Sequence, residues 1–246
     1  LMELFIILDS LKRSFAGKVH VVMPYFPYSR QDRVATPREP ISAKLIADLL
    51  STAGANHLIA LKFHSDQEQG FFNFPVDNLS THKLFADYFR KKKISDLVVV
   101  SPDAGGARDA KKVADLLGAN LAIIHKTRPA HNKAEVQHVV GEVKGKNCLI
   151  YDDMVDTGGS VTEAAKALKT RGAKSLYFAA THAVLSGPAH ERLASVGFKE
   201  VVFSNTVPIP KKKHFKEMKV LSVAPLLAQI IKNVHEEKSV TGVFNS

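Results

Sequence analysis

Three acidic side chains stand directly before a glycine turn in the middle of the chain. Residues 148–151 form an apolar run of strand length, Asp152, Asp153 and Asp156 follow, and residues 157–160 read Thr-Gly-Gly-Ser. The carboxylates can accept hydrogen bonds from sugar hydroxyls or hold a divalent metal. The turn amides and the start of the following helix can hold a phosphate. One ligand that carries a ribose and a phosphate would satisfy both halves.

Further polar side chains follow four other runs that are expected to be strands. The runs are residues 19–23, 57–63, 97–101 and 120–124, and the side chains that follow them are, in that order, Arg30 with Gln31, His64, Asp103, and Lys126 with Arg128. In open α/β sheets, ligands collect at the carboxyl ends of the strands. These residues are therefore candidates for the same chemistry as the acidic turn.

The elements that must position these residues alternate along the chain. Apolar periodicity predicts helices at residues 1–11, 41–53, 81–92, 107–117, 161–168, 187–196 and 224–235, and strands at the runs above and at residues 175–180, 200–204 and 220–223. Residues 71–76 read as an apolar connector, Ser80 as a helix cap, and residues 125–132 as an exposed, mobile loop. The alternation argues for right-handed βαβ units and a parallel sheet.

Composition limits the class of protein. The chain has 246 residues, 45% of them hydrophobic and 24% charged, which is ordinary for a soluble globular protein of one or two domains. No apolar run reaches the length of a membrane span. The single cysteine, Cys148, lies in an expected buried strand, so it reads as core filling in a reducing compartment and predicts a cytoplasmic protein.

The net charge of +10 raises nucleic acid as a partner, with a highly phosphorylated small substrate as the other cause. Much of the excess stands in the lysine runs 91–93 and 211–213, with little aromatic interleaving. Solvated surface lysines are the favoured interpretation. We therefore expect neither a nucleic-acid partner nor a membrane.

The acidic turn resembles the ribose-binding loop of the phosphoribosyltransferase fold, which binds 5-phosphoribosyl 1-pyrophosphate. A longer set of motifs resembles the ribose-phosphate pyrophosphokinase family from residue 1 to residue 244. The motifs are Pro-Tyr-x-x-Tyr-x-Arg-Gln-Asp-Arg at residues 24–33, His64 with Gln-x-Gln-Gly-Phe-Phe at 67–72, Ser-Pro-Asp-x-Gly-Gly at 101–106, Lys-x-Arg-Pro at 126–129 and Thr-His-x-x-Leu-Ser-Gly-Pro at 181–188. Ordinary phosphoribosyltransferases share the central loop but not the whole set.

The resemblance implies a fold of two tandem phosphoribosyltransferase-like α/β domains, each a mainly parallel sheet flanked by helices. The first would occupy residues 1–80 and be rejoined by the closing helix at 230–246, and the second would occupy residues 81–229. Family members also carry an N-terminal segment before the position of Leu1, so the chain is expected to be N-terminally truncated as given. The family further implies a homohexamer.

The implied reaction is diphosphoryl transfer from ATP to the 1-hydroxyl of ribose 5-phosphate, giving 5-phosphoribosyl 1-pyrophosphate and AMP. By resemblance, Asp152 and Asp153 hold the ribose hydroxyls, Asp156 lies beside the 5-phosphate, and Thr157, Gly158, Gly159 and Ser160 hold that phosphate. Lys126 and Arg128 close over the transferring group, Arg30 and Gln31 contact ATP, and His64 and Asp103 bind Mg²⁺ or position its phosphate complex.

The chain departs from the family pattern in the cationic loop. Thr127 stands where the family usually has a basic residue, and His125 replaces an acid. Because Lys126 and Arg128 are both kept, we expect altered loop electrostatics without loss of activity. The alternatives are a phosphoribosyltransferase that consumes the product, a non-catalytic regulatory subunit of a true synthetase, and, on charge alone, a nucleic-acid-binding protein.

Overall fold

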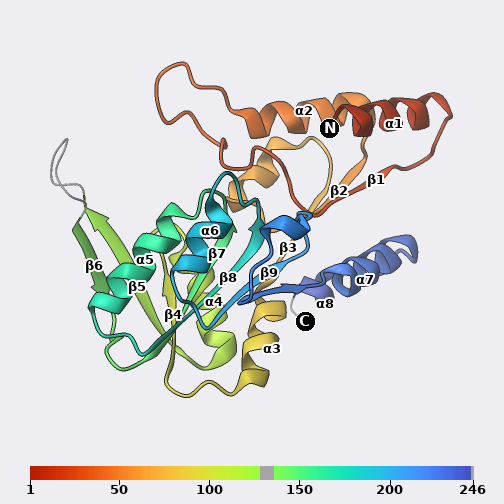
Figure 1. The fold of residues 1–246 in the computed structure, drawn as a ribbon. Coiled ribbons are helices and arrows are strands. Elements are labelled where there is room, and N and C mark those ends of the chain that lie inside the picture. The colour runs from red at the N-terminus through yellow and green to blue at the C-terminus, as the bar shows by residue number, and fades with distance from the viewer. Residues whose placement is uncertain (128–135, 245–246) are drawn as a thin grey trace. The chain divides into compact units, whose positions relative to one another are not determined.

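The computed structural model describes residues 1–127 and 136–244 and divides the chain into two compact units, Leu1–Ser80 and Thr81–Ser246. Figure 1 follows the chain from α1 to α8. In the described part of the chain, no helix combines the length and the apolar character needed to cross a lipid bilayer.

The first unit contains a parallel three-stranded sheet. Its elements are α1 (Met2–Arg13), β1 (His20–Met23), α2 (Ser42–Ala53), β2 (His57–Leu61), the 3₁₀ helix η1 (Asp66–Phe71) and β3 (Val76–Leu79). The strand order is β1-β2-β3. Leu8 of α1 and Ile46 and Leu50 of α2 pack with Val21 and Leu58 on one face of this sheet, which forms the core of the unit.

The second unit contains a seven-stranded sheet in the order β10-β9-β8-β7-β4-β5-β6. Its elements are α3 (His82–Lys92), β4 (Leu97–Ser101), α4 (Ala107–Leu117), β5 (Asn120–Thr127), β6 (Val136–Val140), β7 (Asn147–Val155), α5 (Gly159–Thr170), β8 (Ser175–Ala183), α6 (Ala189–Ser195), β9 (Glu200–Ser204), η2 (Lys211–Lys213), β10 (Met218–Leu221), α7 (Ala224–His235) and α8 (Thr241–Phe244). Every pairing in this sheet is parallel except that of β5 with β6.

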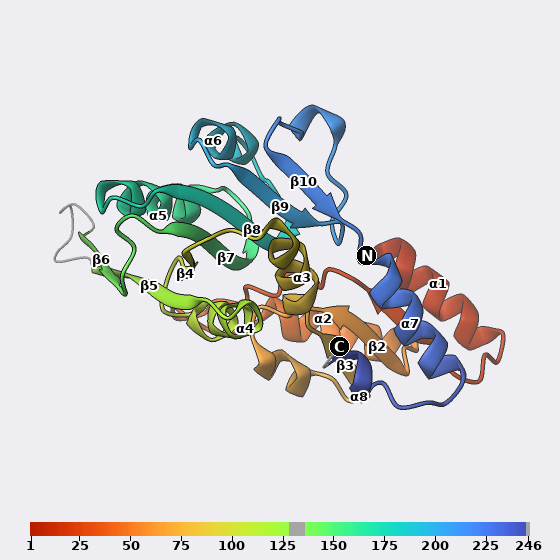
Figure 2. The same cartoon turned by 90° about the horizontal axis from the view of Figure 1, so that it is seen from below.

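Helices cover both faces of the larger sheet, as Figure 2 shows. Val98 and Ile150 point to the face that packs against Val161 and Leu168 of α5. Their neighbours in sequence, such as Leu149, point to the opposite face and pack with residues of α3 and α4. Successive strand residues alternate between faces, so these strands are apolar throughout because both faces are buried.

The strand order reverses direction between β7 and β4. These strands are paired neighbours, but β4 leads into α4 on one face and β7 leads into α5 on the other. Such a topological switch point opens a crevice at the carboxyl ends of the two strands. The loops that follow β4 and β7 therefore border the preferred ligand position of an open α/β sheet.

The predicted α/β class with mainly parallel sheets is confirmed, with local corrections. Residues 72–75 form the expected connector, but Phe71 ends η1 and Val76 begins β3, a strand that was not predicted. Residues 125–127 belong to β5 instead of an exposed loop. Strand β6 was not predicted. Ser80 is not the cap of α3, because Thr81 occupies the N-cap position and gives no side-chain cap. Rejoining of the first domain by the closing helix stays a prediction.

Candidate functional site

Two carboxylates approach the same point at the switch between β4 and β7. A Cβ placed on Gly106 would lie 3.1 Å from Ser101 Oγ, 3.8 Å from Asp103 Oδ1 and 3.9 Å from Asp152 Oδ1. The Gly106 amide donates to Asp103 Oδ1 at 3.0 Å, and Ser101 Oγ donates to the Asp103 carbonyl oxygen at 2.7 Å. The structure thus brings together two candidates that are far apart in the sequence.

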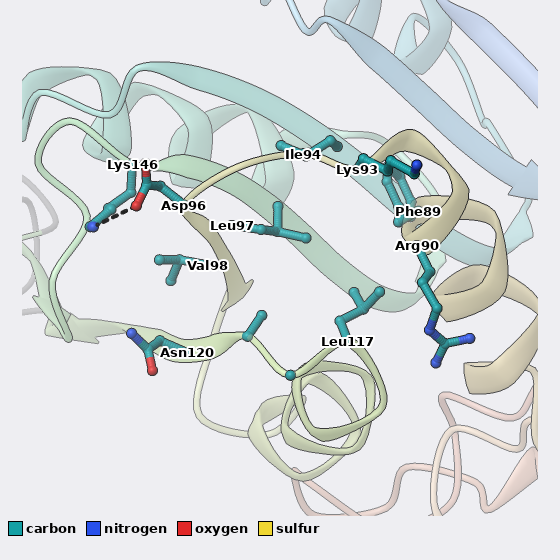
Figure 3. Close-up of a pocket in the computed structure, with 12 residues that line it drawn as sticks. Phe89, Arg90, Lys93, Ile94, Asp96, Leu97, Val98, Leu117, Asn120 and Lys146 are labelled. Atoms are coloured by element: carbon teal, nitrogen blue, oxygen red, sulfur yellow. Dashed lines mark hydrogen bonds and ion pairs between the residues drawn. The ribbon is translucent and has the colours of Figure 1, made fainter.

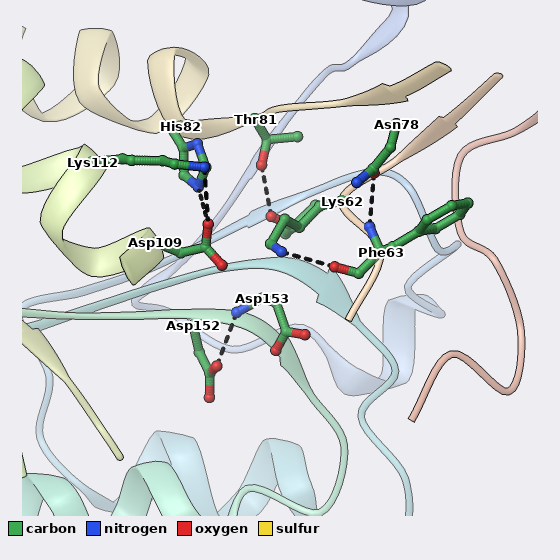
Figure 4. A network of polar contacts seen from close by, with 10 residues as sticks. Lys62, Phe63, Asn78, Thr81, His82, Asp109, Lys112, Asp152 and Asp153 are labelled. Carbon is green, nitrogen blue, oxygen red and sulfur yellow. Dashed lines mark hydrogen bonds and ion pairs between the residues drawn. The ribbon is translucent and has the colours of Figure 1, made fainter. Parts of the chain in front are cut away.

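Asp152 and Asp153 lie inside β7, which was expected to end in these carboxylates but continues to Val155. The Asp153 amide donates to Asp152 Oδ1 at 2.9 Å, as Figure 4 shows. Burial, together with the charges of Asp153 and Asp103, raises the pKa of Asp152 well above its ordinary value. A cation or hydroxyl donors that neutralise this cluster would be bound favourably.

The turn after β7 offers donors to an anion. Gly158 is the N-cap of the 12-residue helix α5 and adopts a left-handed conformation with φ of 74°. Because glycine has no side chain with which to cap a helix, the first amides of α5 are left for another acceptor. Thr157 and Ser160 are exposed beside them. The sequence-predicted phosphate residues thus form one helix N-terminus, which favours negative charge.

Neighbouring backbone fixes the position of this turn. The Ser186 amide donates to the Asp156 carbonyl oxygen at 2.9 Å, and a guanidinium nitrogen of Arg192 donates to the Thr157 carbonyl oxygen at 2.9 Å. A Cβ on Gly158 would lie 3.4 Å from the Ala189 carbonyl oxygen, so the turn packs closely on α6. The contact of Arg192 with Thr157 was not predicted.

Lys126 belongs to the end of β5, next to β4 in the sheet. Ile123 pairs with Ser101, the last residue of β4, and β5 continues to Thr127. Lys126 pairs with Gln137 of the antiparallel strand β6. The backbone of Lys126 thus lies beyond the carboxyl end of β4. The loop that contains Asp103 begins at this same end of the sheet. Arg128 lies outside the described residues.

In the first unit, Arg30 and Gln31 lie exposed in the loop that follows β1. The Gln31 amide donates to the Tyr28 carbonyl oxygen at 2.8 Å, and Ser42 Oγ donates to Gln31 Oε1 at 2.5 Å. The loop is anchored by Phe26, which is buried against Phe63 and Phe72. This anchoring keeps Arg30 and Gln31 at the surface.

His64 follows β2 and is exposed, and a buried carboxylate lies behind it. The His64 amide donates to Ser29 Oγ at 2.9 Å. Ser29 Oγ lies 2.7 Å from each carboxylate oxygen of Glu68, and the Ser65 amide donates to Glu68 Oε1 at 2.9 Å. Burial raises the pKa of Glu68 to about 7, although the bonds from Ser29 and Ser65 lower it.

Sequence reasoning missed Ser29 and Glu68. One signal was present, since Ser65 and Glu68 have the Ser-x-x-Glu spacing of a capping box. That spacing predicts the contact of Ser65 with Glu68 but says nothing of Ser29, which lies 39 residues from Glu68.

A cavity of about 390 Å³ lies at the other end of the larger sheet, where β4 and β5 begin. Figure 3 shows Phe89, Leu97 and Leu117 lining it, with Asn120 at the start of β5. Its position at the amino ends of β4 and β5 separates it from the acidic turn at the carboxyl ends. It therefore takes no part in the chemistry predicted here.

Within residues 1–127 and 136–244, no group of three or more acids, histidines or cysteines is placed to hold a metal ion by itself. Mg²⁺ commonly takes one or two protein carboxylates and completes its shell with substrate phosphates and water. Asp103 and Asp152, which share one small region and repel each other, fit that mode better than a closed protein cage.

Comparison with known proteins points to the family that the motifs of the sequence resemble. The family described as N-terminal domain of ribose phosphate pyrophosphokinase matches residues 1–54, and the family described as phosphoribosyl synthetase-associated domain matches residues 128–245. The chain is 50% identical to the ribose-phosphate pyrophosphokinase of Bacillus caldolyticus over 245 residues, which cover 100% of the chain and 78% of that protein. It is 47% identical to the ribose-phosphate pyrophosphokinase of Corynebacterium ammoniagenes, covering 100% and 77%.

A solved structure supports the same assignment. The phosphoribosylpyrophosphate synthetase of Mycobacterium smegmatis superposes with a TM-score of 0.91 at 49% identity, covering 96% of this chain and 78% of that one.

Proposed function

The chain belongs to the ribose-phosphate pyrophosphokinase family, and from that premise we propose how its residues transfer a diphosphoryl group from ATP to ribose 5-phosphate. The products are 5-phosphoribosyl 1-pyrophosphate and AMP. The observation that supports the assignment of residues is the switch point between β7 and β4, where Asp103 and Asp152 both lie close to Gly106 and the N-terminus of α5 follows β7.

The acceptor sugar would occupy the end of β7. Its 5-phosphate would accept hydrogen bonds from the first amides of α5 and from the hydroxyls of Thr157 and Ser160. Its 2- and 3-hydroxyls would donate to Asp152 and Asp153, and these donors would offset the burial and the repulsion that raise the pKa of Asp152. Binding at both ends would leave the 1-hydroxyl of the ring as the nucleophile, with Asp156 beside the phosphate.

The donor would be held through other loops. Arg30 and Gln31 would contact ATP. The oxygen of the 1-hydroxyl would form a bond to the β-phosphorus as the bond from that phosphorus to the oxygen of AMP breaks, and the hydroxyl proton would be released. Lys126 and Arg128 would neutralise the negative charge on the diphosphoryl oxygens during this step. Their approach would also exclude water, which would otherwise hydrolyse ATP.

The proposed metal is Mg²⁺, with His64 and Asp103 as the residues that would hold or orient it. When bound, this ion would supply positive charge to the phosphate oxygens. His64 is a less usual partner because Mg²⁺ prefers oxygen, so its role would be to position a phosphate-bound ion.

The protein is also proposed to form a homo-oligomer, a hexamer by family resemblance. Apolar side chains on α1 and α2 support assembly, because Met2, Ile6 and Leu45 are 69%, 64% and 57% exposed. Large exposed apolar side chains in a group indicate an interaction surface. A cytoplasmic location is proposed in addition, because the single cysteine is a buried free thiol and the activity belongs to nucleotide metabolism.

The test is formation of AMP by the full-length protein with ATP, ribose 5-phosphate and Mg²⁺. Omission of the sugar should abolish the signal, and Asp153→Asn should raise the KM for ribose 5-phosphate by at least about tenfold, since it removes one charged acceptor. Lys219→Ala, on an exposed side chain of β10, serves as the control.

Other results would point to the other functions. Pyrophosphate release that depends on a nucleobase, without AMP, would indicate a phosphoribosyltransferase. Sugar binding without turnover would indicate a regulatory subunit.

A further inference from the structure

Glu68 is a buried carboxylate that joins two loops of the first unit. Glu68 is 0% exposed and Ser29 is 3% exposed. Ser29 Oγ lies 2.7 Å from both oxygens of Glu68, and the Ser65 amide donates to Oε1 at 2.9 Å. Burying a carboxylate is unfavourable unless donors satisfy it, so these contacts decide where the carboxylate lies.

The partners of Glu68 adjoin the residues assigned to ATP and its metal. Ser29 immediately precedes Arg30 and Gln31 in the loop after β1, and its Oγ also accepts the amide of His64 after β2. One hydroxyl thus contacts the backbone amide of His64 and the carboxylate of Glu68 at once. The hydroxyl can donate a single proton, and it donates that proton to Glu68 while it accepts from His64.

An apolar side chain would fill the same space without this linkage. Phe26 and Phe72, which are buried nearby, already show that the region accepts apolar packing. A carboxylate at this position therefore adds no packing that an apolar residue would lack. What it adds is a fixed direction for Ser29 and for the amide of Ser65.

We propose that Glu68, acting through Ser29, is a positioning residue that holds the Arg30–Gln31 loop and the His64 loop in one arrangement for binding ATP. The inference rests on the proposed function, because that function assigns ATP to Arg30 and Gln31. Glu68 touches neither substrate in this view. Its effect would appear in the affinity for ATP and not in that for ribose 5-phosphate, whose proposed residues all belong to the second unit.

The experiment uses the full-length protein and two measurements. Steady-state AMP formation gives separate KM values for ATP and ribose 5-phosphate, and calorimetric titration with ATP and Mg²⁺ gives ATP affinity without turnover. The variants are Ser29→Ala, which removes one hydroxyl, Glu68→Ala, which removes the carboxylate, and Glu68→Gln, which keeps its size and one acceptor oxygen. Asp48→Asn is the matched control, because it removes a carboxylate from a half-exposed ion pair with Lys44 on α2.

In Ser29→Ala and Glu68→Ala, the KM and the Kd for ATP should rise by about tenfold. This is the size of effect expected from the loss of one charge-assisted hydrogen bond. Glu68→Gln should stay within about threefold of the wild type. The KM for ribose 5-phosphate should change by less than about twofold in all variants, and Asp48→Asn should match the wild type.

Two results would overturn the inference. One is an unchanged ATP affinity in folded Ser29→Ala. The other is an equal rise in both KM values, which would mean that the network only supports the fold. Absence of AMP from the wild type would instead refute the proposed function, and the ATP titration would still decide the role of Glu68.

Discussion

The Nδ1 atoms of His20 and His57 lie 2.9 Å apart across the parallel pair of β1 and β2. At this distance one nitrogen carries a proton and the other accepts it. Nε2 of His57 lies 3.1 Å from Asp77 Oδ2 and so can donate to that carboxylate. His20, His57 and Asp77 thus form a line of hydrogen bonds from β1 to β3, with one proton between the two Nδ1 atoms. If both Nδ1 atoms carried a proton, their two N–H groups would repel each other.

This relationship predicts that acid destabilises the first unit. Burial, then the charges of His57 and Lys18, lower the pKa of His20 below its ordinary 6.5. The unfolded chain therefore binds a proton at His20 at a higher pH than the folded chain does, so the free energy of unfolding falls as pH falls through 6.5. Melting temperatures between pH 7.5 and 5.5 should fall less for His20→Gln than for the wild type.

His235→Gln, which changes an exposed histidine at the end of α7, is the control for His20. Its melting temperature should follow the wild-type pH dependence. Identical slopes for His20→Gln and the wild type would contradict the contact between the two histidines.

The raised pKa of Glu68 predicts that stability falls as pH rises, the opposite of the effect of His20. Its pKa is raised from 4.5 to about 7 by burial, so the folded state holds the proton more tightly than the unfolded state. Protonation of Glu68 therefore contributes to the free energy of unfolding. This contribution is fully present below pH 4.5 and is lost as the pH rises to about 7, which lowers the free energy of unfolding by roughly 3 kcal/mol. Urea unfolding at pH 5 and pH 8 should show this loss in the wild type and not in Glu68→Gln. A loss of equal size in both proteins would count against it.

Asp152→Asn should stabilise the fold and weaken the site. The substitution removes a charge that is buried and repelled by Asp153 and Asp103, so the melting temperature should rise. The same change removes a proposed acceptor for a ribose hydroxyl, so the Kd for ribose 5-phosphate should rise by about tenfold or more. Calorimetry with ribose 5-phosphate measures the second effect. A fall in melting temperature would mean that a partner of the carboxylate outweighs the repulsion.

Lys126→Ala should separate binding from turnover. Because the ammonium group is assigned to the transferring diphosphoryl group, kcat for AMP formation should fall by about 100-fold or more while ribose 5-phosphate binds nearly as before. Single-turnover AMP formation and sugar titration provide the two values. Lys219→Ala, which removes an exposed cation of β10, should retain wild-type kcat. Near-normal turnover in Lys126→Ala would remove the β5 end from the mechanism.

Much of the fold follows from apolar periodicity. The bounds of β4, α4, β9 and α7 match the predicted ranges, because each element has a clear apolar pattern and a clear end. Strand β7 continues through Asp152 and Asp153, although carboxylates are depleted in strands. Pairing with β8 as far as Val155 outweighs that local preference. Strand β6 has a weaker signal because Gln137 and His138 interrupt its apolar residues.

The site divides in the same way. The acidic turn and Gly158 are local features, so the sequence was sufficient to predict that a helix begins directly after them. The role of this helix N-terminus as a phosphate position stays a prediction. The contacts of Ser29 with Glu68 and of Arg192 with Thr157 join residues 39 and 35 positions apart. No local spacing encodes such pairs, and only the packed sheet shows them.

The neighbouring position of β4 and β7 also affects how the protein folds. Asp103 and Asp152 are separated by roughly 50 residues of chain that include α4, β5 and β6, and closing a loop of that length costs entropy before its contacts form. Asp103 and Asp152 therefore come together only after the sheet has been assembled around this insertion. A nascent chain that stops before β7 would carry the Asp103 loop and both β5 and β6, yet it would lack Asp152 and Asp153, the proposed acceptors for the ribose hydroxyls.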